Sequence, residues 1–339
     1  MVLRSKILGT GMYVPEKIVT NDDLSAMLET SDEWIRQRTG IEQRHWVDLK
    51  SKTSTSDLGL EAAKIALKNS GVDKSEIDMI ILATLSPDHE LPGTACFLQK
   101  KLEVPGIPAL DVRQQCTGFI YSLSIADQYI RSGTYKKILI VGAEIHSRGL
   151  QKTPKGRDVS VLFGDGAGAV VVGATEVKDA AKDSHILSTH LHADGAFAEE
   201  LWTPFPGSAQ AGNRVEASML EDGSIWPAMN GKTVFTHAVK RMPEVLLEAL
   251  AKNNLKIEDI DLFVFHQANL RINDMIAKQF EIPSDKVFNT IQKYANTTAA
   301  TIPIGLDEAV RVGKLKKGML VASAAFGSGF TWASAIYRW

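Results

Sequence analysis

The sequence predicts an α/β protein made of two copies of one α/β unit, and three observations lead to this fold class. Apolar runs without polar interruption, such as Met79–Thr84 and Ile138–Ala143, are typical of parallel strands covered on both faces. Segments with helical periodicity alternate with these runs, for example Ser56–Ser70, which ends at Gly71. The second half of the chain also repeats segments of the first.

The repeat is visible in two separate segments. Residues 69–82 align with 252–265 at an offset of 183, and residues 127–137 align with 307–317 at an offset of 180. Chance similarity between two helix–strand units is the alternative, but two segments that share nearly one offset favour duplication. We therefore expect parallel strands that alternate with helices, in two units packed back to back.

Local signals predict the remaining elements. Lys6–Pro15 is a strand that ends in a Gly/Pro turn, and Asn21 caps a short helix. Thr30 and Glu33 form a capping box at the start of a second helix. Gly164–Gly168 superficially resembles a dinucleotide-binding loop, but a strand and not a helix follows it, so we expect a turn between strands.

The composition excludes several classes of protein. The chain has 339 residues, 44% of them hydrophobic and 23% charged, which suits an ordinary globular protein. A net charge of −2 argues against bulk binding of nucleic acid or a membrane surface. No uncharged run approaches the roughly 18 apolar residues of a membrane span, and the first residues contain no apolar leader. We expect a cytoplasmic protein that binds neither nucleic acid nor membrane.

The two cysteines, Cys96 and Cys116, are too few for a disulfide framework and have no metal-ligand spacing, so no metal is expected. Cys116 ends a predicted buried strand that begins near Asp111, and a helix over Thr117–Ser132 follows at once. A helix N-terminus favours a thiolate and offers N–H groups to an oxyanion, and both properties suit thioester exchange. The alternative is an inert core cysteine, which fits Cys96 better.

The repeat gives Cys116 a candidate neighbour. The offset of 180 pairs it with Asn296, which lies just before the corresponding helix of the second half. In a two-fold arrangement, equivalent helix starts can face one another and bring thiol and amide into one pocket. His266 ends the apolar strand that begins at Leu262, and open α/β sheets place their sites at such strand ends. A hydrogen-bonded core histidine is the alternative, and the remaining histidines, including His146, are interpreted as structural.

Motifs spread along almost the whole chain carry a resemblance to one family, that of β-ketoacyl-acyl carrier protein synthase III. The match is specific because the motifs occur in order over nearly the full length. They are Thr30-Ser-Asp-Glu-Trp34-Ile, Arg38-Thr-Gly-Ile41, Cys116-Thr-Gly-Phe, Phe163-Gly-Asp-Gly-Ala-Gly168, His190-Leu-His-Ala-Asp-Gly195, His266-Gln-Ala-Asn-Leu-Arg271, Asn296-Thr-Thr-Ala-Ala and Phe326-Gly-Ser-Gly-Phe-Thr-Trp332.

The resemblance implies a thiolase-type fold, with duplicated α/β halves in a layered α-β-α-β-α arrangement, and a homodimer. The half at 1–175 would carry the nucleophile Cys116, and the half at 176–339 would carry the other triad members, His266 and Asn296.

The resemblance also implies the reaction. Cys116 would take the acyl group of an acyl-coenzyme A primer, and malonyl-acyl carrier protein would then enter. His266 and Asn296 would hydrogen-bond the malonyl thioester carbonyl as carbon dioxide leaves, and the N–H groups of Cys116 and Ser328 would hold the oxyanion. The product is a β-ketoacyl-acyl carrier protein, which initiates fatty acid synthesis. Acyl-coenzyme A is a substrate here, and no permanently bound cofactor is implied.

Substrate contacts are implied for two further sets of residues, for which an ordinary solvated surface is the alternative. Trp34, Arg38, Arg157 and Asn269 resemble the coenzyme A contacts, since an indole plane and guanidinium groups suit a purine and its phosphates. The carrier protein would dock at two basic residues, Arg271 and Lys278.

Departures from the family pattern concern the primer. The segment 193–232 is long enough for a lid or tunnel wall, and Leu91 stands where many members have an aromatic that closes the acyl pocket across the dimer. Leu91 and Phe330 are our acyl-pocket candidates, Lys232 replaces an asparagine often found beside the pantetheine arm, and Ser328 replaces a usual glycine. We expect a primer longer than acetyl.

Three other functions are weighed against this one. The nearest is a related condensing enzyme or acyltransferase of a secondary-metabolite pathway. A cysteine thioesterase or hydrolase would deacylate Cys116 with water, whereas a condensing enzyme holds the acyl group until malonyl arrives. A non-catalytic binding protein is disfavoured because all three triad residues are present.

Overall fold

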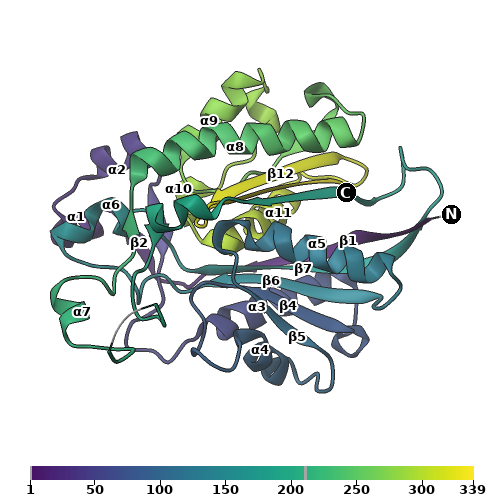
Figure 1. The fold of residues 1–339 in the computed structure, drawn as a ribbon. Coiled ribbons are helices and arrows are strands. Elements are labelled where there is room, and N and C mark those ends of the chain that lie inside the picture. Colours follow the sequence, from purple (N-terminus) through teal and green to yellow (C-terminus); the bar gives the residue numbers. More distant parts are fainter. Residues whose placement is uncertain (1, 210–211) are drawn as a thin grey trace.

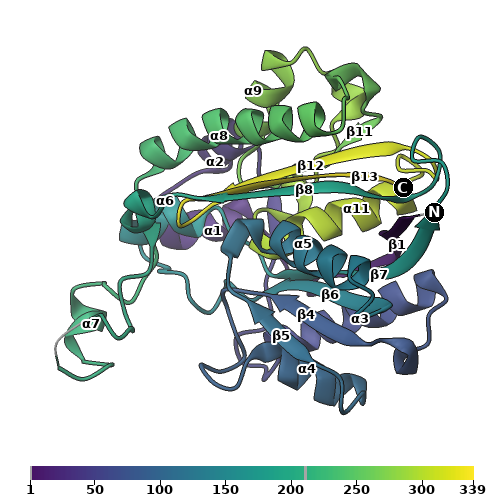
Figure 2. The ribbon, with the colours of Figure 1, turned by 45° about the vertical axis from the view of Figure 1, so that its right-hand side comes forward.

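The protein, described here by a computed structural model over residues 2–209 and 212–339, is built from two β-sheets that alternate with layers of helices (Figure 1). One sheet takes its strands from the first half of the chain and the other from the second half. Helices cover the outer face of each sheet and fill the space between them (Figure 2). The predicted α-β-α-β-α layering is therefore confirmed.

The first sheet has the strand order β1-β7-β6-β4-β5. Strand β4 pairs in parallel with β5 and β6, whereas β7 pairs antiparallel with β6 and β1. The strands are β1 (Val2–Tyr13), β4 (Met79–Ala83), β5 (Ala109–Val112), β6 (Lys137–Glu144) and β7 (Gly166–Val177).

The second sheet repeats this pattern in the order β11-β12-β13-β8. Its first pair is parallel and the other two pairs are antiparallel, as in the equivalent part of the first sheet. In the position that corresponds to β5, the described residues form a parallel bridge between Phe263 and Val287. The strands are β8 (His185–Ala193), β11 (Leu262–Phe263), β12 (Leu320–Gly327) and β13 (Thr331–Arg338). The two sheets thus support the duplication that the repeat predicts.

The main helices form the other layers. Helices α3 and α4 cover the outer face of the first sheet, α8 and α9 cover that of the second, and α5 and α11 share a hydrophobic core between the sheets. Their bounds are α3 (Thr55–Ser70), α4 (Thr94–Leu102), α5 (Gly118–Arg131), α8 (Gly231–Lys252), α9 (Leu270–Gln279) and α11 (Thr301–Arg311).

Smaller elements lie at one end of the layers. A separate hydrophobic cluster joins β2, α1, α2, α10 and the loops around them. Figure 2 shows the segment that contains α7 projecting away from the layered body. The bounds are β2 (Ile18–Thr20), α1 (Asn21–Leu28), α2 (Asp32–Thr39), β3 (Gln43–His45), α6 (Arg157–Ser160), β9 (Leu201–Trp202), α7 (Ser218–Glu221), β10 (Ala228–Met229) and α10 (Ile291–Tyr294).

Several local predictions were wrong in detail. Thr20 and not Asn21 caps α1, and Ser31 caps α2 by accepting a hydrogen bond from the N–H of Trp34. The predicted capping box at Thr30 does not form, because the neighbouring Ser31 takes the capping position. Strand β5 is half-buried and not buried, since it lies at the edge of its sheet.

Two further expectations also changed. Gly164–Gly168 is not a turn between strands but leads directly into β7, because the following apolar residues extend the sheet as far back as Gly166. The segment expected as a loop at 193–232 contains β9, α7 and β10, and its last residues, Gly231 and Lys232, begin α8. Residues 210–211 of that segment lie outside the described residues.

The two halves touch through backbone at the start of the central helices. A Cβ atom at Gly142 of β6 would lie 2.3 Å from the carbonyl oxygen of Ala299, just before α11. Only a residue without a side chain permits this approach. The contact brings the start of α11 against the sheet that carries α5, so equivalent positions of the two halves become neighbours.

Candidate active site

Two cavities meet at Cys116. The first has a volume of about 620 Å³ and is also lined by His266 and Asn296. The second, of about 650 Å³, is lined by Ser328 and by Trp202 and Ile225 of the projecting segment. The three residues of the expected triad therefore share one cavity, and the sulfur-bearing residue alone among them also lines the other.

Cys116 lies in a 3₁₀ turn, Gln115–Thr117, between β5 and α5. Its side chain is buried, and the end of β12 packs directly on it. A Cβ atom at Gly327 would lie 2.5 Å from the Cβ atom of Cys116 and 2.9 Å from its Sγ. A glycine is required at this point because any side chain would displace the thiol.

Burial determines the protonation of Cys116. It raises the pKa of the thiol to about 12, and the carboxylate of Glu144 acts in the same direction. Hydrogen bonds from the backbone N–H groups of Cys116 and Ser328 oppose this shift only in part. The prediction that the helix start favours a thiolate was therefore wrong, because the desolvation of the sulfur outweighs the N–H dipoles.

Glu144 is a fully buried acid at the end of β6. Burial raises its pKa to about 7. Its carboxylate accepts hydrogen bonds from the N–H groups of Leu85 and Ser86 and from the hydroxyl groups of Thr84 and Ser86. These donors hold the 84–86 loop against β6, next to the second cavity.

His266 continues the pairing of β11, since its N–H donates to the carbonyl of Ala324 at 2.9 Å. Its Nδ1 lies 2.7 Å from the Thr301 hydroxyl, which donates to the carbonyl of Thr298 at 3.1 Å. A hydroxyl that donates there can accept from Nδ1–H, which leaves Nε2 as an acceptor. Nε2 is buried and has no partner among the described residues, and burial lowers the pKa of His266 to about 3. The ring is therefore neutral and has a free nitrogen.

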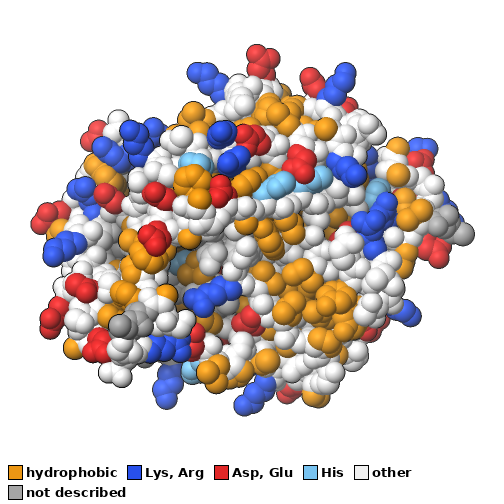
Figure 3. Space-filling model, viewed as in Figure 1, with side chains coloured by type: hydrophobic (Ala, Val, Ile, Leu, Met, Phe, Trp, Pro, Cys, Tyr) orange, Lys and Arg blue, Asp and Glu red, His pale blue; other side chains and the backbone are white. Residues whose placement is uncertain are grey.

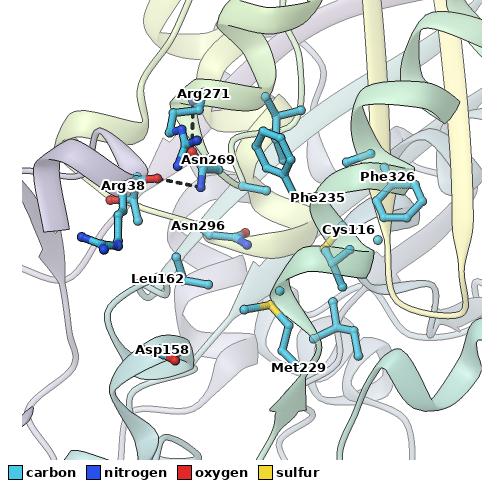
Figure 4. A pocket seen from close by; sticks show the side chains of 18 of the residues that line it. Arg38, Cys116, Asp158, Leu162, Met229, Phe235, Asn269, Arg271, Asn296 and Phe326 are labelled. Atoms are coloured by element: carbon cyan, nitrogen blue, oxygen red, sulfur yellow. Dashed lines mark hydrogen bonds between the residues drawn. The ribbon is translucent and has the colours of Figure 1, made fainter. Parts of the chain in front are cut away.

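Asn296 is fixed on both sides. Its backbone N–H donates to the carbonyl of Leu162, and its carbonyl accepts from the N–H of Gly164. The side-chain oxygen accepts from the N–H of Thr298 at 2.8 Å, which leaves the amide N–H groups for the cavity. Figure 4 shows the amide pointing across the cavity on the side of Cys116.

Trp34, Arg38 and Arg157 come together at the mouth of the first cavity. Both guanidinium groups lie over the indole of Trp34, at 4.4 Å for Arg38 and 4.9 Å for Arg157. A ring inserted between Trp34 and Arg157 needs roughly 7 Å, twice the usual contact distance of about 3.5 Å. Arg157 would have to move before a purine could be sandwiched there.

Asn269 lines the same cavity, but its side chain already has partners. Its oxygen caps α9 by accepting from the N–H of Arg271 at 3.0 Å, and its amide donates to the carbonyl of Arg38 at 3.0 Å (Figure 4). Asn269 thus ties α9 to the end of α2.

The predicted docking residues both lie on α9. Arg271 and Lys278 are exposed, seven positions apart and so on one face of the helix. Arg271 also lines the first cavity, where its guanidinium lies 5.4 Å from the ring of Phe235. Lys232 lines this cavity as well.

The acyl-pocket candidates lie elsewhere. Leu91 is 78% exposed, and it lines neither cavity. Phe330 is buried among aromatic side chains and stacks on Phe197 at 5.3 Å. The segment 193–232, which we expected to form a lid or a tunnel wall, does line the second cavity, through Trp202 and Ile225.

Sequence reasoning missed His146, Thr298 and Thr301. His146 was interpreted as structural but lines the second cavity, and its Nε2 lies 2.7 Å from the hydroxyl of Thr298. Thr298 and Thr301 follow Asn296 at the start of α11, so the repeat that identifies Asn296 also pointed to this turn.

Over residues 2–209 and 212–339, no group of three or more His, Cys, Asp or Glu side chains is arranged to hold a metal ion. His190 and His192 both contact Glu248, at 3.2 and 2.6 Å. None of the helices that the structure describes has the length and apolarity to cross a membrane.

The arrangement suits acyl transfer to sulfur. A buried thiol has a neutral imidazole and an amide donor in the same cavity, and two backbone N–H groups point at the sulfur. Such groups can accept the thiol proton and stabilise an oxyanion. Because Cys116 lines both cavities, a chain attached to its sulfur can lie in one cavity while the other stays open to a second group.

Comparisons with known proteins agree with this chemistry. Residues 110–195 match the family described as 3-oxoacyl-[acyl-carrier-protein] synthase III, and residues 250–339 match its C-terminal region. The curated β-ketoacyl-[acyl-carrier-protein] synthase III of Xanthomonas campestris pv. campestris is 46% identical over 335 residues, which cover 99% of this chain and 98% of the relative.

Solved structures agree as well. The crystal structure of 3-oxoacyl-[acyl-carrier-protein] synthase III from Aquifex aeolicus is 41% identical with a TM-score of 0.88, covering 99% of this chain and 100% of that one. The priming β-ketosynthase from the R1128 polyketide biosynthetic pathway is 30% identical with a TM-score of 0.86, covering 98% and 96%.

The protonation of Cys116 can be tested by alkylation. Because burial raises the pKa of the thiol to about 12, the thiolate fraction should rise about tenfold per pH unit from pH 7 to 10. In a Cys96→Ala variant, iodoacetamide labelling of Cys116 is measured by intact mass. Its rate should also rise about tenfold per pH unit over this range, without levelling off. The urea-unfolded variant is the control and should level off near the ordinary thiol pKa of about 8.5. A plateau below that pH in the folded protein would contradict the assignment.

Proposed function

The chain belongs to the β-ketoacyl-acyl carrier protein synthase III family, and on that premise we propose how its residues carry out the family's reaction. The protein is a condensing enzyme that joins an acyl primer to a malonyl unit with loss of carbon dioxide, in fatty acid synthesis. We infer that the primer is an acyl-coenzyme A and that the malonyl unit arrives on acyl carrier protein. The enzyme would work in the cytoplasm, where both thioesters are made and used.

In the first half-reaction Cys116 is acylated. Nε2 of His266, the free acceptor of the neutral ring, takes the thiol proton as Sγ attacks the thioester carbonyl. The oxyanion is held by the N–H groups of Cys116 and Ser328. The carbon–sulfur bond to coenzyme A then breaks, and the leaving thiolate takes the proton from Nε2. Protons balance, and the ring returns to its neutral state.

In the second half-reaction the malonyl thioester enters through the first cavity. Its carboxylate leaves as carbon dioxide, and the electron pair forms an enolate whose oxygen accepts hydrogen bonds from Asn296 and His266. For His266 to donate, its proton must sit on Nε2, and the Thr301 hydroxyl then donates to Nδ1 in place of the Thr298 carbonyl. The enolate carbon attacks the acyl-cysteine, and the thiolate released takes a proton from water.

The observation that supports this scheme most is the pair of cavities that share Cys116. The primer chain can stay in the second cavity while the arms of coenzyme A and of the carrier protein occupy the first cavity in turn, so the acyl chain need not move between the two half-reactions. A volume of about 650 Å³ supports a primer longer than acetyl, since it lies within the roughly 300–1,000 Å³ of sites for sizeable ligands.

A priming role in a secondary-metabolite pathway is the second candidate. The likeness to the priming β-ketosynthase of the R1128 pathway favours it, at 30% identity. The condensation chemistry is the same in fatty acid synthesis and in a secondary-metabolite pathway, so it cannot distinguish the two candidates. The choice of primer can.

Acylation of Cys116 is the direct test. Incubation with octanoyl-coenzyme A should add one acyl group by intact mass, and malonyl-acyl carrier protein should then remove it as a β-ketoacyl product. Cys116→Ala should take up no acyl group, whereas Asn296→Ala should still be acylated but lose condensation by about 100-fold or more, as for an oxyanion donor. Equal labelling of Cys116→Ala would refute the nucleophile. Release of the acyl group by water alone would indicate a hydrolase, and faster turnover with acetyl-coenzyme A would refute the longer primer.

We also propose that α9 docks the carrier protein. Arg271→Glu and Lys278→Glu should each raise KM for malonyl-acyl carrier protein by about tenfold, because rim charges mainly govern association with an acidic partner. The effect should weaken as salt is added. Lys314→Glu, an equal charge change at an exposed position after α11, is the control. If Lys314→Glu raised KM as much, the docking assignment would be wrong.

A homodimer through the edge of the first sheet is the third proposal. Strand β5 ends the sheet, and no strand of the described residues pairs with its outer side. Half-buried apolar side chains of β5 and α5 adjoin it, among them Leu110, Tyr121 and Ile125. Figure 3 shows hydrophobic side chains gathered on this face, where Figure 1 places α5 and β5. An open edge with apolar neighbours is suited to pairing with a second copy.

Sedimentation velocity tests the dimer. The protein should sediment as a dimer at micromolar concentration, and Ile125→Glu should weaken association at least tenfold, because it buries a charge in the interface. Ile65→Glu on α3, which is 37% exposed and remote from β5, is the matched control and should leave the dimer intact. A monomeric parent protein, or a dimer indifferent to Ile125→Glu, would contradict this interface.

A further inference from the structure

The second cavity contains polar groups that none of the steps above uses. His146 follows β6, is only 7% exposed and lines this cavity together with Cys116. Gln115, the residue before the nucleophile, lines it too. A cavity meant only for hydrocarbon would have no reason to present an imidazole and an amide beside the reacting sulfur.

One nitrogen of His146 is available to a ligand. Nε2 lies 2.7 Å from the Thr298 hydroxyl, and the ring packs on Phe163 with centroids 4.5 Å apart. Nδ1 has no hydrogen-bond partner among the described residues and is not fully buried. Because the Thr298 hydroxyl can donate or accept, Nδ1 can carry a proton or a lone pair as a ligand requires.

Gln115 adds a second group at the same end of the cavity. Its side-chain amide makes no hydrogen bond within the described part of the chain. Its backbone has a φ of 40°, in the left-handed region that residues with side chains rarely adopt. Local strain of this kind persists where the surroundings hold a residue in a functional position.

The charge of these groups indicates the kind of ligand. Burial lowers the pKa of His146 to about 3, so the ring is neutral near pH 7. Asp88 lines the same cavity, and its carboxylate, which accepts hydrogen bonds from the N–H and the hydroxyl of Ser56, disfavours an anion. Arg148 donates to the carbonyls of Ser51 and Thr53, and Arg113 is exposed at the rim. A neutral oxygen that accepts or donates a hydrogen bond fits this environment best.

The position of these groups indicates where that oxygen lies on the ligand. Gln115 adjoins Cys116, and His146 bonds Thr298, whose N–H holds the side chain of Asn296. Both groups are therefore near the thioester end of a bound acyl chain. An unsubstituted chain would cover them and leave polar atoms unpaired, whereas an oxygen substituent would pair with them.

We propose that the second cavity selects an acyl primer with a neutral hydroxyl or keto oxygen near its thioester, and that His146 is a specificity-determining residue. This rests on the proposed function, because it assumes that the cavity receives the primer carried by Cys116.

Rates of Cys116 acylation test the proposal. Octanoyl-, 3-hydroxyoctanoyl- and 3-oxooctanoyl-coenzyme A are compared at equal concentration by intact mass. At least one oxygenated ester should acylate Cys116 about tenfold faster than octanoyl-coenzyme A, in line with a site that hydrogen-bonds its substrate. His146→Leu should bring this ratio close to one, mainly through faster octanoyl transfer. Leu150→Met, an apolar change in the same cavity, should alter all rates alike.

A ratio of one or below in the parent protein would overturn the proposal, and an unchanged ratio in His146→Leu would overturn the role of His146. If His146→Leu misfolds, Gln115→Leu provides a second test of the proposal. It should lower the ratio of the two acylation rates by a smaller factor than His146→Leu. Failure of the proposed function would look different, because then no acyl-coenzyme A would label Cys116 or no acyl-enzyme would react with malonyl-acyl carrier protein.

Discussion

The active site depends on close backbone contact where the two halves of the molecule meet. Gly142 admits the carbonyl of Ala299 at the start of α11, and Gly327 lets the end of β12 lie against the side chain of Cys116. Without these contacts the thiol of Cys116 from one half and the amide of Asn296 from the other would not share a cavity. The reacting groups thus come from the equivalent starts of α5 and α11, and the two glycines set the distance between these helix starts.

The same tight packing determines the electrostatics. Burial keeps the thiol of Cys116 protonated and the imidazole of His266 neutral, so the resting site holds no ion pair. Its reactivity then depends on which atom holds each proton, and the Thr301 hydroxyl, within reach of both Nδ1 of His266 and the carbonyl of Thr298, can serve either tautomer. A neutral site also avoids the large desolvation penalty of a buried thiolate–imidazolium pair.

The internal repeat predicted the duplication and the pairing of Cys116 with Asn296, because a repeat compares positions that one fold makes equivalent. The layered α-β-α-β-α arrangement came from the family resemblance. Prediction from the sequence failed for properties that depend on several segments meeting in the fold. The pKa of Cys116 was misjudged since a helix start is a local feature, whereas desolvation comes from the whole fold. His146 was missed because nothing beside it marks a site, and its neighbours in the second cavity come from distant parts of the chain. At α2, two adjacent capping residues competed and Ser31 prevailed over Thr30.

At the mouth of the first cavity, the guanidinium of Arg157 covers the indole of Trp34 and therefore competes with any ligand ring that would stack there. A purine that bound there, as the family resemblance implies for coenzyme A, would have to displace a guanidinium from the indole face, so its measured affinity would be reduced to the fraction of molecules in which the stack is open. The same stack could re-form after the nucleotide left and would then hinder its return. Weak retention of coenzyme A would suit the proposed cycle, because the first cavity has to be vacated before the malonyl thioester can enter it.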